Sequence, residues 1–306
     1  MKVLSLFDGM SCGQIALKQL GIIPEVYYAS EIDKHAIKQT QLNFPDTIQL
    51  GDVARWREWD VDWKSIDLIL AGSPCQGFSF AGKQLAFDDP RSKLFFVFID
   101  ILNHIRSLNP DVLFLLENVN MKKSHMRIIS EYCGVFPVNI NSNLVSAQNR
   151  DRWYWTNIRT KQVGLFGEVY SDIPQPEDKS IFLRDILESE VDEKYYITSK
   201  CLEYITKEFR LKKGYTQIDS KDKDLPLMAK GYSNWTGDYV SVAIRGREII
   251  RRLTPVECSR LQIIPSWYRW KCSDTQICKM LGNGWTVDVI VHILSFMKEK
   301  LNINVA

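Results

Sequence analysis

The first half of the chain alternates short apolar runs with longer segments of helical character. Residues 2–7, 26–30, 67–71 and 112–116 have the length and near-continuous apolarity of buried parallel strands. Helices are expected at residues 14–20, 33–43 and 92–108. Gly21 ends the first of them and Asn109-Pro110 ends the third. Repeated strand–helix units with short turns predict an α/β fold with a doubly wound, mostly parallel sheet.

The character of the sequence changes after Trp155. From Asn157 to about Ile244 the periodicity weakens, lysines become denser, and Gly, Pro, Tyr and Trp are frequent. We interpret this stretch as a second, smaller and irregular domain. Loops that decorate a single domain are the alternative interpretation.

A pattern typical of helices returns near the C-terminus. Thr254, Pro255 and Glu257 have the spacing of a helix N-terminus with a capping box and proline at its first position. A terminal amphipathic helix is expected over residues 287–300. The predicted boundaries divide the chain into residues 1–160, residues 161–271, and a segment 272–306 that returns to the first domain.

Composition and charge narrow the choice of function. The chain has 306 residues, with 45% hydrophobic and 25% charged residues, and 39 basic against 37 acidic side chains leave a net charge of only +2. Any site for a polyanion must therefore be a local basic cluster. Seven cysteines without a CxxC pair and four scattered histidines argue against disulfides and metal. We find no signal peptide and no run of transmembrane length, so we expect a metal-free cytoplasmic protein without membrane contact.

Small and acidic residues follow three of the expected strands. The turn Phe7–Gly13 precedes a helix, where exposed backbone N–H groups suit a nucleotide-like ligand, although it departs from GxGxxG. Glu31 lies where α/β folds bind ribose hydroxyls, and Asp52 could accept from an adenine amino group. A tight turn and solvated loop acids are the alternative. Three such groups at successive strand ends favour an adenosine-containing ligand.

A thiol and a carboxyl group follow two further strands. Cys75 comes after the run at 67–71 and Glu117 after the run at 112–116, so both are expected at one edge of the sheet. A thiolate can add to an electron-poor ring while the acid protonates a ring nitrogen. Arg150 and Arg152 could supply the electropositive setting that a thiolate needs. The alternatives are a packing cysteine and a surface ion-pair cluster.

Taken together, these motifs resemble the DNA (cytosine-5)-methyltransferase family. The resemblance runs from near residue 2 to near residue 295. The matching segments, in the family's order, are Phe7–Gly13, Pro74–Gln76, Gly82–Gln84, Glu117–Val119, Gln148–Arg152, Arg252–Gln262 and Gly282–Trp285. The Pro-Cys-Gln motif is of bacterial or phage type, whereas Phe7-Asp8-Gly9 and Trp285 resemble the animal de novo branch.

The resemblance implies a mechanism and a set of catalytic residues. Cys75 would add to C6 of a flipped-out cytosine while Glu117 protonates N3, and C5 would then take the methyl group of S-adenosyl-L-methionine. Arg152 would hold the cytosine O2, and Arg150 would hold a phosphate or the backbone of the active site.

The resemblance also assigns the cofactor and DNA contacts. Catalysis and cofactor binding fall to residues 1–160 and target recognition to 161–271. The cofactor residues would be Phe7, Asp8, Gly9, Ser11, Gly13, Glu31, Ile32, Asp52, Val53, Pro74, Asn283 and Trp285. Double-stranded DNA would be bound by Ser79, Gly82, Lys83, Gln84, Arg245 and Arg247, the first four on or near a mobile loop.

Two basic clusters lie in the expected recognition region. They are Lys207, Arg210, Lys212 and Lys213, and Arg245, Arg247, Arg251 and Arg252. Phosphate contact is the functional interpretation, with Tyr232 and Trp235 lining the groove, and a solvated face is the alternative. Arg245-Gly246-Arg247 is the better candidate for DNA contact, because it directly precedes the segment that supports recognition.

Three other functions remain open. The first is a tRNA cytosine-5 methyltransferase of the same fold, although Gly77-Phe78-Ser79 follows the style of the DNA enzymes. The second is a catalytically silent DNA-binding homologue, which intact Cys75, Glu117 and Arg152 disfavour. The third is a Rossmann oxidoreductase, which would need the missing glycine fingerprint. The target sequence, the oligomeric state and a cognate restriction endonuclease acting separately are left open.

Overall fold

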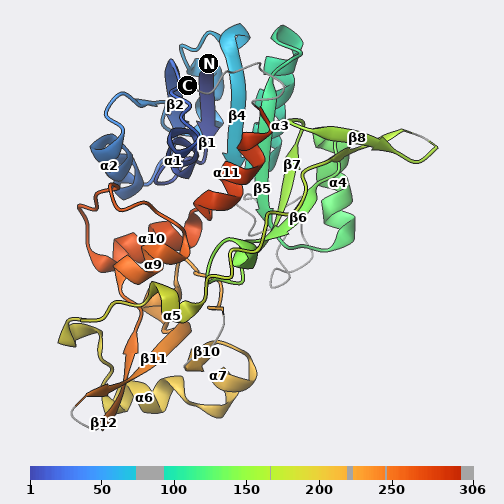
Figure 1. Ribbon diagram of the computed structural model, residues 1–306. Coiled ribbons are helices and arrows are strands. Elements are labelled where there is room, and N and C mark those ends of the chain that lie inside the picture. The colour runs from blue at the N-terminus through green and yellow to red at the C-terminus, as the bar shows by residue number, and fades with distance from the viewer. Residues whose placement is uncertain (74–92, 166, 219–222, 245–246, 298–306) are drawn as a thin grey trace. The chain divides into compact units, whose positions relative to one another are not determined.

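The computed structural model describes residues 1–73, 93–165, 167–218, 223–244 and 247–297. The chain forms two compact units, and Figure 1 labels many of their helices and strands. The first unit contains Met1–Ile140, Asp151–Gln175 and the chain from Val289, and the second contains Asn141–Arg150 and Pro176–Asp288. These breaks differ from the boundaries expected at residues 160 and 271, which stay predictions about functional domains.

A seven-stranded sheet runs through the first unit in the order β3-β2-β1-β4-β5-β7-β6. The strands are β1 Lys2–Leu6, β2 Val26–Ser30, β3 Ile48–Gln49, β4 Ile66–Gly72, β5 Leu113–Val119, β6 Val138–Asn141 and β7 Asp151–Thr156. The neighbours from β3 to β5 pair in parallel, and β7 is antiparallel to β5. The predicted α/β fold with a mostly parallel sheet is confirmed.

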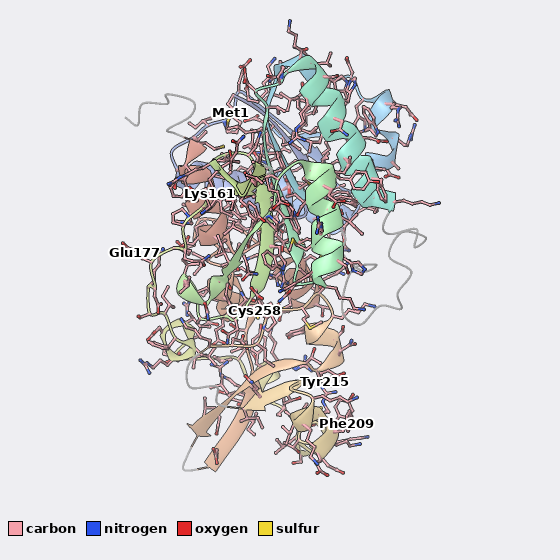
Figure 2. All side chains as sticks on the ribbon, turned by 90° about the vertical axis from the view of Figure 1, so that its right-hand side faces the viewer. Met1, Lys161, Glu177, Phe209, Tyr215 and Cys258 are labelled. Atoms are coloured by element: carbon pink, nitrogen blue, oxygen red, sulfur yellow. The ribbon has the colours of Figure 1, made fainter. Side chains whose placement is uncertain are left out.

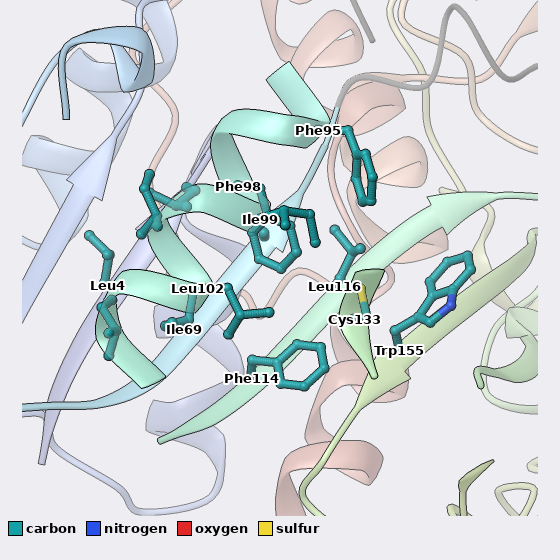
Figure 3. Close-up of a cluster of buried hydrophobic side chains, with 14 of the residues drawn as sticks. Leu4, Ile69, Phe95, Phe98, Ile99, Leu102, Phe114, Leu116, Cys133 and Trp155 are labelled. Atoms are coloured by element: carbon teal, nitrogen blue, oxygen red, sulfur yellow. The ribbon is translucent and has the colours of Figure 1, made fainter. Parts of the chain in front are cut away.

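Both faces of the sheet are covered, so its central strands are apolar throughout. Side chains alternate between the two faces along each strand. Ile69 belongs to the core cluster that α3 (Lys93–Leu108) completes with Phe98, as Figure 3 shows. The next residue, Leu70, points to the opposite face and meets α1 (Cys12–Gln19). Burying each such side chain stabilises the fold by roughly 1.5–3 kcal/mol.

The remaining elements of the first unit are short connections and covering helices. They are α2 Lys34–Asn43, η1 Val53–Glu58, η2 Trp63–Ser65, α4 Lys123–Cys133, β8 Thr160–Val163, β9 Glu168–Ser171 and most of α11 Val287–Ser295. The Asp33 carboxylate accepts from the backbone N–H of His35 at 2.9 Å. Asp33 is therefore the N-cap of α2 rather than its first residue.

The second unit is built from shorter elements, as its weak periodicity predicts. Its strands β10 Thr216–Ile218, β11 Gly237–Ile244 and β12 Arg247–Arg252 form one sheet. Its helices are η3 Ser142–Leu144, α5 Leu183–Ile186, η4 Glu193–Tyr195, α6 Ser199–Ile205, α7 Glu208–Lys212, α8 Gly231–Asn234, α9 Pro255–Leu261 and α10 Asp274–Asn283.

The start of α9 confirms the capping box expected from the sequence. Thr254 Oγ1 accepts from the Glu257 N–H at 3.1 Å, and the Glu257 carboxylate accepts from the Thr254 N–H at 2.8 Å. The same carboxylate forms a bidentate ion pair with Arg251, at 2.7 and 2.8 Å. Both side chains are buried, with 2% and 0% exposure. Glu257 thus joins the last strand of the second unit to the helix that follows it.

Replacing Glu257 by glutamine should destabilise the second unit by about 3–5 kcal/mol, because Arg251 would stay buried without its counter-charge. Urea unfolding monitored by fluorescence and circular dichroism would measure the loss. The matched control is Glu208→Gln, which breaks an ion pair with Lys212 whose side chains are 79% and 74% exposed. That control should cost under about 1 kcal/mol. Equal losses in the two variants would contradict the assigned role of Glu257.

Residues 274–295, which contain α10 and α11, are long and apolar enough to cross a membrane by length and composition alone. The expectation that no run reaches that length is therefore wrong. Of the most apolar window, 67% is buried inside the protein. Val289, Ile290 and Ile293 are fully buried. Core helices have this burial, so the apolar stretch is explained by packing.

Candidate active site

The ends of β1, β2 and β3 lie side by side, and the candidate cofactor residues follow them. The Asp8 N–H donates to the Ser30 carbonyl at 3.1 Å, and the Ser30 hydroxyl donates to the Gly51 carbonyl at 2.7 Å. These two bonds tie the residues after β1 to those after β2 and β3. Phe7, Glu31 and Asp52 are therefore brought to one edge of the sheet, as expected.

Glu31 is held by the backbone of the loops around it. Its Oε2 accepts from the Gly9 N–H at 2.8 Å. Its Oε1 accepts from the N–H groups of Ile32 and Asp33, both at 2.8 Å. This arrangement fixes the carboxylate beside the loop that follows β1. Asp52 is more exposed and caps η1, where its Oδ1 accepts from the Ala54 N–H at 2.9 Å.

The loop after β1 has an unusual backbone. Phe7, Gly9 and Ser11 have φ angles of 59°, 60° and 67°, in the left-handed region that side chains disfavour. A side-chain carbon added at Gly9 would meet nothing within 4 Å. The space beside this glycine is open among the described residues, so a ligand can approach the loop closely.

Gly13 is required for a different reason, which is close packing inside α1. A carbon added there would lie 2.5 Å from Leu70 Cδ1 and 2.9 Å from the Tyr27 hydroxyl. Both neighbours belong to the sheet beneath the helix. The helix that begins at the candidate cofactor loop can therefore approach the sheet only with glycine at this position.

Gly13→Ala is expected to destabilise the first unit by about 1–3 kcal/mol through overpacking. The better helix propensity of alanine would offset about 1 kcal/mol of that loss. Urea unfolding is the measurement, with Gln19→Ala as the control because Gln19 is exposed on the same helix. A Gly13→Ala protein at least as stable as the wild type would show that the contact with Leu70 is relieved at no cost.

Several other candidate cofactor residues differ in their surroundings. Ile32 is 72% exposed, whereas Val53 is 5% exposed and belongs to the hydrophobic core. In the second unit, Asn283 is the exposed last residue of α10 and Trp285 is 9% exposed. Pro74 lies outside the described residues.

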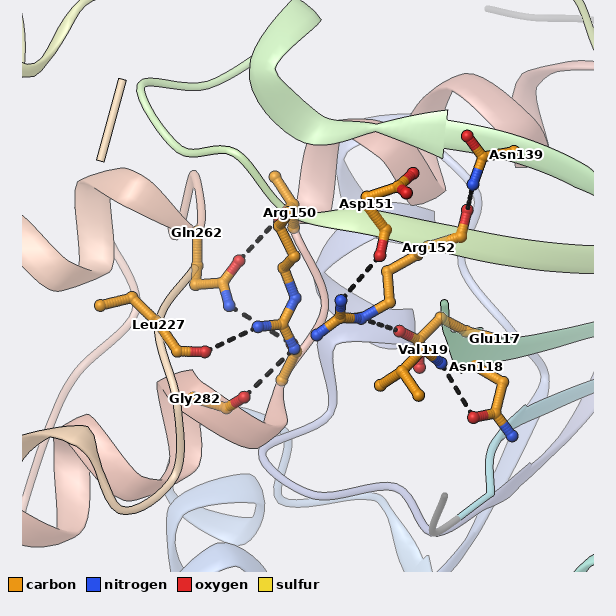
Figure 4. A network of polar contacts seen from close by, with 12 residues as sticks. Glu117, Asn118, Val119, Asn139, Arg150, Asp151, Arg152, Leu227, Gln262 and Gly282 are labelled. Atoms are coloured by element: carbon orange, nitrogen blue, oxygen red, sulfur yellow. Dashed lines mark hydrogen bonds and ion pairs between the residues drawn. The ribbon is translucent and has the colours of Figure 1, made fainter. Parts of the chain in front are cut away.

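A carboxylate–guanidinium pair lies where catalysis is expected. Arg152 Nε is 2.9 Å from Glu117 Oε1, and the two side chains are 16% and 12% exposed (Figure 4). The contact is electrostatic, because Nε lacks the alignment of an ordinary hydrogen bond. Arg152 Nη1 also donates to the Asp151 carbonyl at 2.7 Å. Glu117 lies inside β5 rather than after it, which corrects the expected end of that strand at Leu116.

Register places Glu117 next to the end of β4. Gly72 and Glu117 are partners in the parallel pairing of β4 with β5, and Tyr154 is the antiparallel partner of Glu117 on β7. The acid therefore has a strand on each side and little freedom to move. Cys75 follows Gly72 by three residues but lies outside the described residues.

Arg150 is a buried scaffold residue in the second unit. The residue is 5% exposed, and its guanidinium donates to the carbonyls of Leu227, Gly282 and Gly284, at 2.8, 3.1 and 2.9 Å. Of the two roles expected for it, these contacts favour binding of backbone over binding of a phosphate. Arg150 holds the turn that contains Asn283.

Two buried glutamines that the motifs did not single out as functional bind segments that Arg150 also binds. Gln148 accepts from the Leu227 N–H at 2.8 Å. Gln262 donates to the Leu281 carbonyl at 2.6 Å and accepts from the Thr286 hydroxyl at 2.8 Å. Gln148 and Gln262 both lie inside segments that resemble family motifs. That position was the one sequence feature that could have pointed to their role.

The basic clusters contain fewer accessible charges than the sequence suggests. Arg210 is 4% exposed and donates to the Trp235 carbonyl. Arg251 is paired with Glu257, and the Arg252 guanidinium lies 3.1 Å from the centre of the Trp235 ring. For these three arginines, the contacts inside the protein favour a packing role over phosphate contact.

Exposed residues of the first cluster remain available to a partner. Lys207, Lys212 and Lys213 are exposed. Phe209 and Tyr215, which are 50% and 44% exposed, lie near one another in Figure 2. Arg247 begins β12. Ser79, Gly82, Lys83, Gln84 and Arg245 lie outside the described residues.

Among the described residues, no group of histidine, cysteine and acidic side chains could hold a metal ion. None of the six cysteines within those ranges forms a disulfide.

Comparisons with known proteins agree with this fold. Residues 1–299 match the family model described as C-5 cytosine-specific DNA methylase. The Type II methyltransferase M1.ScrFI of Lactococcus lactis subsp. cremoris is 31% identical over 98% of this chain and 78% of its own. M.HpaII of Haemophilus parainfluenzae is 31% identical, over 97% of this chain and 89% of its own.

Solved structures show the same fold at lower identity. The S. pombe Dnmt2 methyltransferase superposes with a TM-score of 0.72 at 20% identity, covering 99% of this chain and 100% of its own. The Entamoeba histolytica methyltransferase EhMeth gives 0.74 at 16%, covering 98% of both chains. The fold is thus that of a methyltransferase. More specifically, the chain belongs to the C-5 cytosine-specific DNA methylase family and is a DNA cytosine-5 methyltransferase.

Proposed function

We propose that the enzyme methylates cytosine in double-stranded DNA through a covalent intermediate on Cys75. The observation that carries this proposal is the ion pair between Glu117 and Arg152 at the edge of the sheet where β4 ends. Three residues of chain reach at most about 11 Å, so covalent geometry keeps Cys75 within that distance of Gly72, the partner of Glu117. Nucleophile, acid and arginine can therefore act on one base.

Each residue would have a defined role in the reaction. The Cys75 thiolate forms a bond to C6 of the cytosine while Glu117 gives a proton to N3. Arg152 donates to O2 of the base and holds Glu117 in place. After C5 has gained a methyl group, a base removes the C5 proton, N3 returns its proton to Glu117, and the bond from Cys75 to C6 breaks. Because the target lies inside a duplex, it must first be flipped out of the stack.

The methyl group would come from S-adenosyl-L-methionine, which supplies an electrophilic carbon on a sulfonium. The residues after β1, β2 and β3 fit this cofactor. Gly9 leaves open space for a close approach, Glu31 presents a carboxylate suited to ribose hydroxyls, and Asp52 is an exposed acid suited to the adenine amine. Phe7 offers an aromatic ring, and Asn283 and Trp285 would contact the methionine end.

DNA recognition would fall to the second unit. Arg245 and Arg247 are proposed as phosphate contacts, because the neighbouring Arg251 and Arg252 are already used inside the protein. Restriction–modification is the setting that the names of the Type II relatives indicate.

Bisulfite sequencing of DNA from a methylation-free host that expresses the enzyme tests the proposal. We expect 5-methylcytosine at one short sequence, and unmethylated DNA from cells that express Cys75→Ser. Methylation that persists in the variant would remove Cys75 from the mechanism. A soluble, folded wild-type protein that leaves DNA unmodified would contradict the proposed substrate, and the same assay on cellular tRNA would show whether that is the substrate instead.

A further inference from the structure

Exposed aromatic side chains gather in one short segment of the second unit. This segment, residues 199–215, contains α6, α7 and the turn that leads into β10. Of the five exposed aromatic residues in the described ranges, Tyr204, Phe209 and Tyr215 lie here, and Leu211 between them is exposed as well. Single exposed apolar side chains are ordinary, whereas a cluster of them indicates a binding surface. We call residues 199–215 the aromatic surface.

Phe209 and Tyr215 present open rings on this surface. In the part of the chain that the structure describes, neither ring stacks on another ring or on a cation. The Tyr215 N–H donates to the Arg210 carbonyl at 2.9 Å, so the chain folds back on itself after α7. Phe209 and Tyr215 therefore lie near one another, as Figure 2 shows. Two half-exposed aromatic rings are available side by side.

The backbone beneath the two rings is held in place by Arg210, which is 4% exposed. Its guanidinium donates to the Tyr204 hydroxyl at 3.2 Å, to Thr216 Oγ1 at 3.4 Å and to the Trp235 carbonyl. The guanidinium also lies 4.7 Å from the centre of the Tyr204 ring. These contacts tie α7 to α6 and to β10. A ligand of the aromatic surface would therefore meet a largely ordered site, which lowers the entropic cost of binding.

Lysines surround the rings and make the aromatic surface locally basic. Its exposed charged side chains are Lys200, Glu203, Lys207, Glu208, Lys212 and Lys213. They leave an excess of two positive charges, which equals the net charge of the whole chain. Lys212 contacts Glu208 at 2.5 Å, but both side chains are more than 70% exposed, so this ion pair is weak and can open. The aromatic surface is thus a local cluster that attracts a polyanion.

We propose that the aromatic surface docks single-stranded nucleic acid, in addition to the duplex that contains the target cytosine. Aromatic rings bind nucleic acid by stacking on bases, and the bases of a single strand have faces free for such stacking. The lysines beside the rings suit the phosphates of the same strand. An acidic peptide would satisfy the lysines but leave the rings without a stacking partner. The inference is independent of the covalent mechanism, and it gives the enzyme a hold on DNA that has single-stranded stretches.

Binding of a fluorescein-labelled thymidylate oligonucleotide of about 20 nucleotides to the full chain tests the stacking role. Fluorescence anisotropy is the measurement. The double variant Phe209→Ala/Tyr215→Ala should weaken binding about tenfold or more. The double variant Phe209→Tyr/Tyr215→Phe keeps both rings and should bind within about twofold of the wild type. Leu165→Ala, which changes a 96% exposed apolar side chain in the first unit, is the control and should have no effect.

The salt dependence of the same binding tests the role of the lysines. Each phosphate contact of a single strand contributes about 0.7 to the slope of log affinity against log salt concentration. Lys212→Gln/Lys213→Gln should therefore lower this slope by about 1.4. The matched control Lys38→Gln/Lys64→Gln removes two exposed lysines of the first unit and should leave the slope unchanged.

Four results would overturn the inference. The first is a folded Phe209→Ala/Tyr215→Ala protein, checked by circular dichroism, that binds the oligonucleotide as the wild type does. The second is a wild type that does not bind the oligonucleotide at all. The third is an equal loss of affinity for a blunt duplex without the target, which would assign the rings to duplex DNA. The fourth is poly-L-glutamate that binds as tightly and is weakened equally by the alanine variant, which would assign the aromatic surface to an acidic protein. Methylation of the target duplex is measured separately, so each of these results leaves the proposed activity standing.

Discussion

Cys75→Ser is expected to abolish methyl transfer to DNA while leaving cofactor affinity within about twofold of the wild type. A serine hydroxyl is almost wholly protonated at neutral pH, so it cannot add to C6 as a thiolate does. Without that addition, C5 of a neutral pyrimidine is too weak a nucleophile to take the methyl group. The rate should fall on the order of 10⁴-fold or more, as it does when other covalent enzymes lose their nucleophile.

Transfer of a labelled methyl group to duplex DNA would measure this effect. Cys201→Ser is the matched control, because Cys201 is a free, partly exposed thiol in the second unit. It should keep the wild-type rate. A Cys75→Ser enzyme that retains more than a few per cent of the activity would exclude the thiolate as the nucleophile.

Glu117→Gln is expected to lower the rate of methyl transfer by about 10²–10⁴-fold, the range typical of lost general acid catalysis. Glutamine has nearly the same shape, but its side-chain amide has no acidic proton to give to N3. It also removes the charge that Arg152 contacts at 2.9 Å. Cofactor affinity should be unchanged, since Glu117 lies in β5 next to the end of β4, whereas Phe7, Glu31 and Asp52 follow β1, β2 and β3.

Single-turnover kinetics would separate this loss from a change in DNA binding. The control Glu131→Gln breaks an exposed ion pair with Arg127 on α4 and should have no effect on the rate. If Glu117→Gln weakened DNA binding but left the single-turnover rate intact, Glu117 would be a binding residue and the acid would have to be sought elsewhere.

Local sequence rules predicted the first half of the fold well. The bounds of β2 were predicted without error, and β1, β4 and α3 differ by a residue at one or both ends. The capping box at Thr254 was also readable, because all of its hydrogen bonds lie within four residues. Apolar runs, caps and helix stops act over short distances, so the sequence contains them directly.

Contacts between distant segments set the limit of prediction. Arg252 looked like a free basic residue, but Trp235, seventeen positions earlier, stacks against it. Arg210 also looked like a free basic residue, but its guanidinium donates a hydrogen bond to the carbonyl of Trp235. Glu117 was expected beyond its strand, yet pairing with β4 and β7 extends β5 through Val119. The sequence shows where a charged side chain stands, but not whether that side chain forms an ion pair inside the protein or contacts a phosphate.

The candidate site was also predicted well where contacts are set by single strands, and poorly where they join distant segments. The acids at the ends of β1, β2 and β3 could be predicted to converge, because parallel strands bring their carboxyl ends to one edge. The Glu117–Arg152 pair was predicted only as two members of one active site, since their direct contact depends on the antiparallel register of β5 and β7. The contacts of Arg150 could not be predicted, because its three carbonyl partners come from two segments far along the chain.

Covalent trapping tests the central claim most directly. A duplex with 5-fluorocytosine at the target position blocks the last step, because fluorine replaces the proton that must leave C5. Incubation with the enzyme and S-adenosyl-L-methionine should give a protein–DNA adduct that survives a denaturing gel, and peptide mapping should locate it at Cys75. A wild-type enzyme that methylates the ordinary duplex but forms no adduct, or an adduct that Cys75→Ser still forms, would contradict the mechanism.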